Sequence, residues 1–139
     1  MPHGERIGYL VKQVQQQVRQ ACDAALREHG LTMAQYAVLT ALAESPGIAA
    51  VELARRTFVT RQSLQDVLAG LKAAGLVEVA TAGTGRRRDV TLTPRAATLL
   101  ADADAAVRAV EDRMLAGIGA ADVATTLAVL RRCGENLAR

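Results

Sequence analysis

Two short segments that favour strands interrupt an otherwise helical pattern, and this interruption constrains the fold more than any other feature. Residues 76–79 (Leu-Val-Glu-Val) and 89–92 (Asp-Val-Thr-Leu) are rich in strand-forming side chains. Between them, residues 82–88 contain two glycines and three consecutive arginines, which predicts a hairpin with a basic tip. Because a two-stranded sheet cannot form a core by itself, the core must be helical.

Three helices are predicted before this hairpin, and two of them have clear end signals. The first begins at a capping box that opens with Thr32, and it ends near Glu44. A short helix follows over about residues 50–56, and a third is capped by Thr60 and stopped by Gly75. This order of helices and hairpin is that of a winged helix-turn-helix. The fold class is therefore predicted to be mainly α, with a small β-wing.

Amphipathic helices are also predicted at both ends of the chain. The opening helix, from about Glu5 to His29, carries an apolar seam at spacings of four and three, made by Ile7, Val11, Val14, Val18, Ala21 and Ala25. After the hairpin, a long helix starts at Thr93 and Pro94 and reaches Met114. The last helix carries Val123, Leu127, Leu130 and Leu137. A single helix as long as the first needs a partner to cover its stripe.

Positive charge is concentrated in the middle of the chain. The 139 residues have a net charge of +3. Residues 51–95 hold eight bases and four acids, whereas the remainder holds nine bases and ten acids. A basic middle suggests contact with a polyanion, although a solvated basic face explains the charge equally well.

The third predicted helix supplies side chains that suit reading of DNA. Opposite its apolar stripe, the first turns present polar side chains, and arginine can pair with guanine while glutamine can pair with adenine in the major groove. The hairpin arginines lie where a wing meets the minor groove. An amphipathic helix beside an ordinary charged turn is the alternative interpretation. The candidate DNA-binding residues are Thr60, Arg61, Gln62, Ser63, Gln65, Arg86, Arg87 and Arg88.

Other classes of protein have little support in the sequence. No apolar run approaches the length of a membrane span, and the first residues lack a signal-peptide pattern. Cys22 and Cys133 are too few for a disulfide framework, and neither forms a metal-ligand spacing with His3 or His29. No catalytic constellation or phosphate-binding loop stands out. We therefore expect a cytoplasmic protein that is not an enzyme and needs no cofactor or metal.

The chain resembles the MarR family (multiple antibiotic resistance regulators) of bacterial transcription factors. The resemblance covers nearly all of the chain, and the matching stretches are residues 31–39, 52–54, 59–64 and 71–77. Arg86, Leu92 and Thr93 meet the family's wing pattern. Thr84 stands where the family has an aspartate that helps to brace the wing arginine, so the resemblance leaves the rigidity of the wing open.

The resemblance implies a transcriptional repressor that acts as a homodimer on a pseudo-palindromic site in double-stranded DNA. Residues 1–30 and 94–139 would form the helical dimerisation region, and residues 31–93 the winged helix-turn-helix. A small phenolic or otherwise amphipathic effector would bind between the two regions. Such an effector would favour conformations of the dimer in which the spacing of the two winged helix-turn-helix regions does not fit DNA.

Candidate effector-binding residues are Tyr9 and Tyr36, and each also has a structural interpretation. Tyr36 fits a core residue next to its helix cap, and Tyr9 fits a residue that covers the interface. Two other functions stay open on the same fold. Cys22 could make the protein a thiol-based redox sensor, although a buried inert thiol is the default interpretation. The winged helix could instead dock onto another protein.

Overall fold

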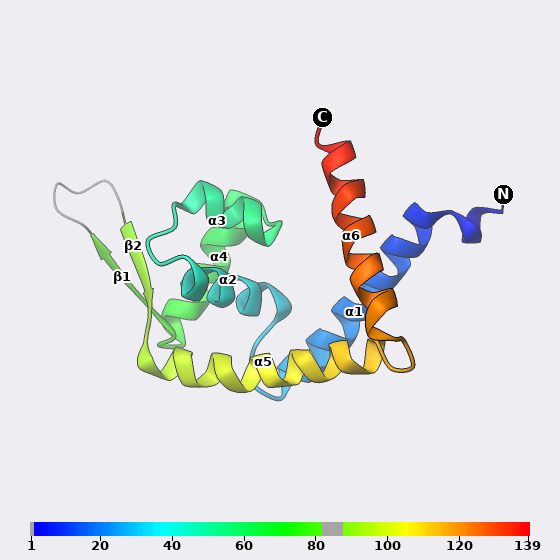
Figure 1. Ribbon diagram of the computed structural model, residues 1–139. Coiled ribbons are helices and arrows are strands. Elements are labelled where there is room, and N and C mark those ends of the chain that lie inside the picture. Colours follow the sequence, from blue (N-terminus) through cyan, green and yellow to red (C-terminus); the bar gives the residue numbers. More distant parts are fainter. Residues whose placement is uncertain (1, 82–87) are drawn as a thin grey trace.

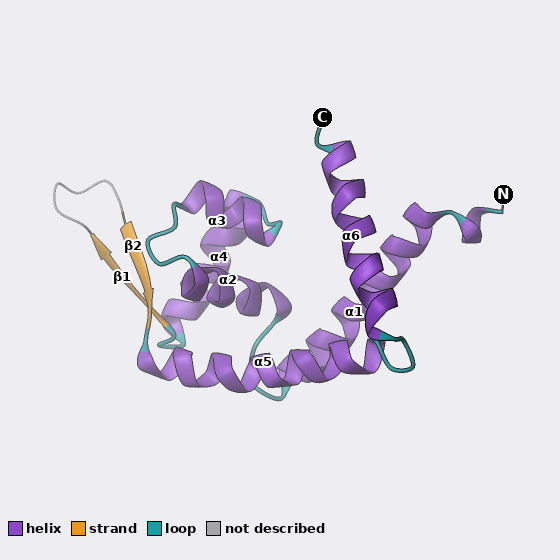
Figure 2. Ribbon diagram, viewed as in Figure 1, coloured by secondary structure: helices purple, strands orange, loops and turns teal. Residues whose placement is uncertain are grey.

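The computed structural model describes residues 2–81 and 88–139, and it has the predicted order of elements. They are η1 (His3–Glu5), α1 (Ile7–Arg27), α2 (Met33–Glu44), α3 (Ala50–Thr57), α4 (Arg61–Ala73), β1 (Val77–Thr81), β2 (Arg88–Leu92), α5 (Pro94–Met114) and α6 (Ala120–Leu137). Figure 1 shows α5 as a long base: α2, α3, α4 and the hairpin gather over one end, and α6 extends from the other. Figure 2 shows that the two strands are a small part of a helical molecule. The predicted mainly α fold with a β-wing is confirmed.

Side-chain caps begin the helices where the sequence predicts them. Thr32 Oγ1 accepts a hydrogen bond from Gln35 N at 3.1 Å, and Gln35 Oε1 accepts one from Thr32 N at 3.0 Å, so the capping box is complete. Thr60 caps α4 and Thr93 caps α5, with Pro94 in the first turn. These contacts satisfy backbone N–H groups that have no partner inside a helix.

Glycines end α1 and α4 in the left-handed conformation. Gly30 has φ +71° and Gly75 has φ +74°. The residue after each glycine donates back into the helix: Leu31 N to Leu26 O at 3.1 Å, and Leu76 N to Leu71 O at 2.9 Å. This is the six-to-one bond of a Schellman motif, in which glycine avoids the steric cost of a Cβ.

The core is aliphatic and lies where α2, α3, α4 and the first half of α5 meet the end of α1. No polar or charged residue is buried among the described residues. The fully buried large side chains are Leu26, Val38, Leu39, Leu53, Leu64 and Leu71, with Cys22 beside them at 2% exposure. The apolar stripe predicted for α4 thus packs inward, which leaves its polar face in solvent.

The two strands pair antiparallel, in a register that places Val77 opposite Leu92 and Val79 opposite Val90. Leu76 is not part of the strand, because its N–H closes the end of α4 and its carbonyl accepts from Thr93 N at 3.1 Å. The predicted first strand is therefore shifted along the chain by one or two residues. The hairpin tip, residues 82–87, lies outside the described residues.

The terminal helices are much less covered than the rest of the chain. The predicted opening helix begins at Ile7 rather than Glu5, because residues 3–5 form a short 3-10 turn and Arg6 provides no side-chain cap. Ile7 is 71% exposed, and none of the residues of α6, all of which the structure describes, is buried. Within the described ranges, no helix is long and apolar enough to cross a membrane.

Candidate nucleic-acid interface

The outer face of α4 presents the predicted DNA-reading side chains to solvent. Arg61, Gln62, Ser63 and Gln65 are all exposed, while Leu64 of the same turns is fully buried. Burial of the leucine stripe fixes the rotation of the helix, so the polar side chains point away from the core. The structure therefore brings these four predicted residues together on one accessible surface.

The start of α4 is organised and lacks negative charge. Thr60 Oγ1 accepts from Ser63 N at 3.0 Å, and the Thr60 hydroxyl donates to Ser63 Oγ at 3.0 Å. The first turn contains no acidic residue. Because a helix N-terminus carries partial positive charge, this end of α4 favours an approaching phosphate.

Asp66 is the acidic member of the exposed face. The sequence suggests that it orients Arg61 or Gln62. Within the described parts of the chain, however, no hydrogen bond or ion pair joins it to either side chain. The reading face is therefore not braced by an internal salt bridge, and Arg61 stays available to a partner.

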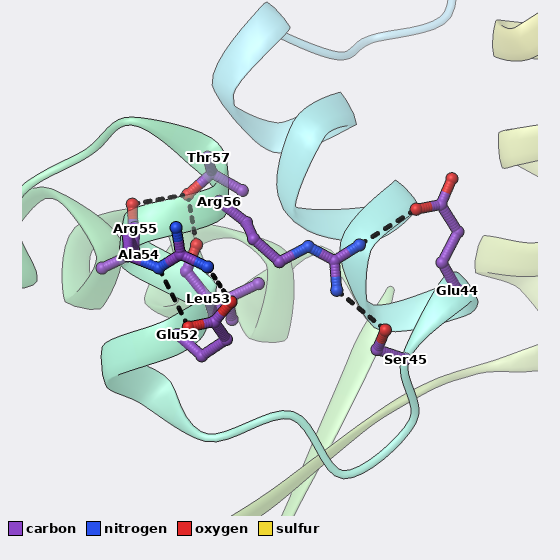
Figure 3. A network of polar contacts seen from close by, with 8 residues as sticks. All are labelled: Glu44, Ser45, Glu52, Leu53, Ala54, Arg55, Arg56 and Thr57. Atoms are coloured by element: carbon purple, nitrogen blue, oxygen red, sulfur yellow. Dashed lines mark hydrogen bonds and ion pairs between the residues drawn. The ribbon is translucent and has the colours of Figure 1, made fainter. Parts of the chain in front are cut away.

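Two of the basic side chains in residues 51–95 already have partners within the winged helix-turn-helix, as Figure 3 shows. Arg56 Nη1 donates to Ser45 Oγ at 2.7 Å and its Nη2 to Glu44 Oε2 at 3.1 Å, which ties the end of α3 to the end of α2. Arg55 forms an exposed ion pair with Glu52, and its hydrogen bond lowers the pKa of that carboxyl. The charge of the middle segment is therefore partly structural.

Arg95 has a comparable structural contact at the other end of the lobe. Its Nη1 donates to Ala74 O at 2.7 Å, and it thereby satisfies a carbonyl at the end of α4 from the first turn of α5. Sequence reasoning could not separate such arginines from free ones, because their acceptors lie about 11 to 21 positions away along the chain.

The wing arginines are only partly placed. Arg88 is the first residue of β2, where it pairs with Thr81 next to the tip of the hairpin. Arg86 and Arg87 lie outside the described residues. The register places Arg88 at the far end of the strands from α4 and α5, next to the part of the hairpin that lies outside the described residues.

Of the two predicted effector residues, Tyr36 lies at a junction between elements. Its hydroxyl donates to Asp104 Oδ1 at 2.5 Å, which joins α2 to α5. Burial, followed by this contact with Asp104, raises the pKa of Tyr36 to about 12. No pattern in the sequence marks Asp104 as a partner of Tyr36, because the two residues are 68 positions apart.

Tyr9 and Tyr36 do not form one site within a single chain. Tyr9 is 40% exposed near the start of α1, whereas the electrostatic neighbours of Tyr36 include Cys22. From residue 9 to residue 22 a helix rises about 20 Å.

A shallow hollow of about 210 Å³ lies between α1 and α5. It contains neither tyrosine. Its wall is mostly aliphatic with a basic rim, and the lining residues are Val14, Gln17, Val18, Ala21, Val110, Arg113 and Met114. The hollow lies on the apolar seam of α1, where Val14 is 43% exposed.

The two cysteines lie in different surroundings. Cys22 is 2% exposed, and burial, with smaller contributions from Asp23 and Glu111, raises its pKa. Cys133 is exposed on α6. Among the described residues, no group of histidine, cysteine or acidic side chains could hold a metal ion.

Comparisons with known proteins agree with the fold. The profile of the MarR family matches residues 29–88, and the HTH-type transcriptional repressor Rv2887 of Mycobacterium tuberculosis is 37% identical over 131 residues, or 94% of each chain. The chain belongs to the MarR family. The matched residues contain α2, α3 and α4, and α4 carries the exposed polar face described above.

Two crystal structures of that relative match this MarR family chain closely. The complex of Rv2887 with DNA has a TM-score of 0.77 at 35% identity, covering 93% of this chain and 98% of the other. The complex of Rv2887 with salicylic acid has a TM-score of 0.77 at 36% identity, covering 92% and 96%. The family and the repressor name of this relative indicate a transcriptional regulator.

Proposed function

We propose that this chain is a homodimeric transcriptional repressor that binds operator DNA through α4 and the wing and responds to a small aromatic acid. The observation that carries the proposal is the rotation of α4, which buries Leu64 and Leu71 and leaves its polar first turns free. Membership of the MarR family and the DNA complex of a relative at 35% identity support the same conclusion.

The residues of the interface take distinct roles in this proposal. Arg61, Gln62 and Gln65 read base edges in the major groove, where bidentate pairing to guanine or adenine is possible. Thr60 and Ser63, at the start of the helix, contact phosphate. The wing places Arg86, Arg87 and Arg88 toward the minor groove, whose negative potential attracts arginine.

Dimerisation would involve residues 1–30 and 94–139, and the winged lobe would be residues 31–93. The support is the exposed apolar surface of α1 and α6, which includes Ile7 at 71% and Leu137 at 86% exposure. Apolar patches of this kind commonly mark interfaces. A two-fold dimer would place two α4 helices about one helical turn of DNA apart, and the operator would be a pseudo-palindrome.

The effector would act at the joint between the lobe and the long helices. A relative was crystallised with salicylic acid, which is a small aromatic acid with a phenolic hydroxyl. Such a ligand offers groups that could compete for the Tyr36–Asp104 hydrogen bond between α2 and α5. A ligand that changes this joint would change the spacing of the two lobes and hence the fit to DNA.

A salt titration on random-sequence duplex tests the DNA-binding part of the proposal. A protein that neutralises several phosphates loses affinity steeply as salt rises, with a slope of about −0.9 for each phosphate contacted. We expect a slope of about −3.6 or steeper, because each of two copies would contribute at least two cations. An affinity that is absent at low salt, or that does not change with salt, would favour docking onto a protein instead.

Salicylic acid itself is the probe for the effector. It should lower the affinity for a selected duplex and raise the thermal midpoint of the free protein, because it binds the folded state. The redox alternative is tested by treating the wild type and the Cys22→Ser variant with peroxide and comparing their release of DNA. Peroxide-induced release that is lost in this variant would indicate a redox sensor, which the burial of Cys22 does not favour.

A further inference from the structure

Phe58, in the turn between α3 and α4, combines an unfavourable backbone conformation with an exposed aromatic ring. Its φ is +58° and its ψ is +35°, and among the described residues it is the one non-glycine residue with a positive φ. Its side chain is 96% exposed, more than that of any other exposed large apolar residue described. The fold therefore holds a large apolar group in water at a strained position.

Every other left-handed position in the described chain is a glycine. Gly30, Gly47, Gly75 and Gly117 have φ values between +71° and +80°. The turn at Phe58 is of the same kind as those after α1 and α4, since Val59 N donates to Ala54 O at 3.1 Å in a six-to-one bond. Glycine would meet the backbone requirement at position 58 with less strain, and a fully exposed phenylalanine gains nothing from burial.

The position of Phe58 points to what covers its ring. It lies two residues before Thr60, the cap of α4, and three before Arg61, which opens the exposed polar face. Arg55, one turn earlier on α3, is also exposed, and its side chain is 72% accessible. The ring thus lies on the turn that leads into α4, and not on α1 or α6, whose apolar side chains are also exposed.

We propose that Phe58 packs against a thymine methyl group in the major groove and so contributes to operator specificity. This inference rests on the proposed DNA-binding function of α4. Phenylalanine is one of the side chains that can make apolar contact with the 5-methyl of thymine, the one apolar group that base pairs present in that groove. Burial of the ring in the complex would offset the strain that the free protein carries.

Substitution by glycine separates this role from a structural one. Phe58→Gly relieves the left-handed strain, so the thermal midpoint of the free protein should stay the same or rise by about 2–5 °C. The same change should weaken binding about tenfold or more, measured on the tightest duplex that the wild-type protein selects from a random pool. A purely structural residue would show loss of stability together with loss of affinity.

The thymine contact is tested directly by changing the DNA. Replacing the thymines of the selected duplex with deoxyuridine removes their methyl groups and keeps every hydrogen bond of the base pair. For the wild type we expect a loss of about fourfold in each half-site, or about fifteenfold over two. Phe58→Gly should bind the thymine and deoxyuridine duplexes with affinities that differ by less than about twofold.

Val51→Ala is the matched control, because Val51 is an exposed apolar residue of the same lobe, at 61%, with ordinary helical backbone. It should keep the wild-type preference for thymine. Equal affinities of Phe58→Gly and wild type for the selected duplex would overturn the inference. So would a loss of affinity relative to wild type that is the same on the thymine duplex as on the deoxyuridine duplex. If the wild type selects no duplex at all, the proposed function itself fails.

Discussion

The helices of the winged lobe and the terminal helices all have an apolar face, but only in the lobe does a single chain bury that face. In the lobe, Leu53, Leu64 and Leu71 are no more than 2% exposed. In α6, Leu130 is 45% exposed and Leu137 is 86% exposed. The lobe thus buries its stripes within the chain, whereas α6 and the start of α1 present theirs to solvent. The difference is the one that the proposed dimer requires, in which a second copy would cover the apolar faces of the terminal helices.

Helix α5 shows the transition between the two regions within one element. Ala96, Leu100 and Ala103 belong to the core of the lobe, and Met114 at the other end is 41% exposed. A rigid helix that is anchored in the lobe at one end and in the expected interface at the other can pass a change at the interface to α4. The following predictions test this division, from the largest expected effect to the smallest.

Leu130→Asp should separate the two regions most clearly. A carboxylate on the apolar face of α6 would have to be buried unpaired in a dimer, which costs several kcal/mol. We expect a monomer by analytical ultracentrifugation and a loss of DNA affinity of more than about 100-fold, because only one half-site can be held. The lobe should remain folded, as judged by circular dichroism.

Thr125→Asp is the control for Leu130→Asp. It places the same charge on α6 about 140° around the helix from Leu130, away from the apolar stripe. This variant should stay dimeric and bind DNA normally. A dimeric Leu130→Asp protein with unchanged affinity would show that α6 is not the interface.

Leu64→Ala and Leu127→Ala make the same chemical change in the two regions. Leu64 is fully buried, so its truncation should lower the free energy of unfolding by about 2–5 kcal/mol at any protein concentration. Leu127 is 48% exposed in the chain, so its effect should appear through the dimer and depend on protein concentration. Urea unfolding at two concentrations distinguishes them. Equal concentration dependence for both variants would contradict the proposed boundary between the winged lobe and the dimerisation region.

The sequence predicted those parts of the fold that are determined locally. The caps at Thr32, Thr60 and Thr93 act between residues three positions apart, and the turns at Gly30 and Gly75 depend on one residue each. Helical periodicity then placed Leu64 inward and Arg61 outward. These signals depend on near neighbours in the chain, so they can be recognised before the fold is known.

The contacts that the sequence did not reveal connect distant segments. Asp104 accepts from Tyr36 across 68 positions, and Arg56 bonds to Glu44 and Ser45 on another helix. No periodicity marks a residue for such a contact, because tertiary packing decides which polar side chains meet. The sequence also did not indicate that Phe58 is exposed. An apolar residue in a turn is usually covered, and tertiary packing decides whether it is.

Arg61→Ala tests the surface of the lobe without disturbing either region. If Arg61 reads a base, affinity for the selected duplex should fall by about 1–3 kcal/mol and preference at one position should relax. Lys72→Ala, which removes a cation from the exposed face near the other end of α4, should cause a smaller loss that is equal on all sequences. A uniform loss for Arg61→Ala would assign it to phosphate contact. Neither change should alter the dimer or the thermal midpoint.

Tyr36→Phe tests the joint between the two regions and should have the smallest effect. It removes the hydrogen bond to Asp104, which is worth about 1 kcal/mol in the free energy of unfolding near neutral pH. The pKa of Tyr36 is raised from 10.0 to about 12, so the folded state keeps the proton that the unfolded state loses. The resulting stabilisation is complete below pH 10 and disappears as the pH rises from 10 to 12.

The measurement is urea unfolding between pH 8 and pH 12 for wild type and Tyr36→Phe. The wild type should lose its advantage over Tyr36→Phe as the pH rises from 10 to 12. A constant gap between wild type and Tyr36→Phe would mean that the hydroxyl is not held as a donor. If the gap closes as expected but salicylic acid still releases DNA from Tyr36→Phe normally, the joint stabilises the fold without transmitting the ligand signal.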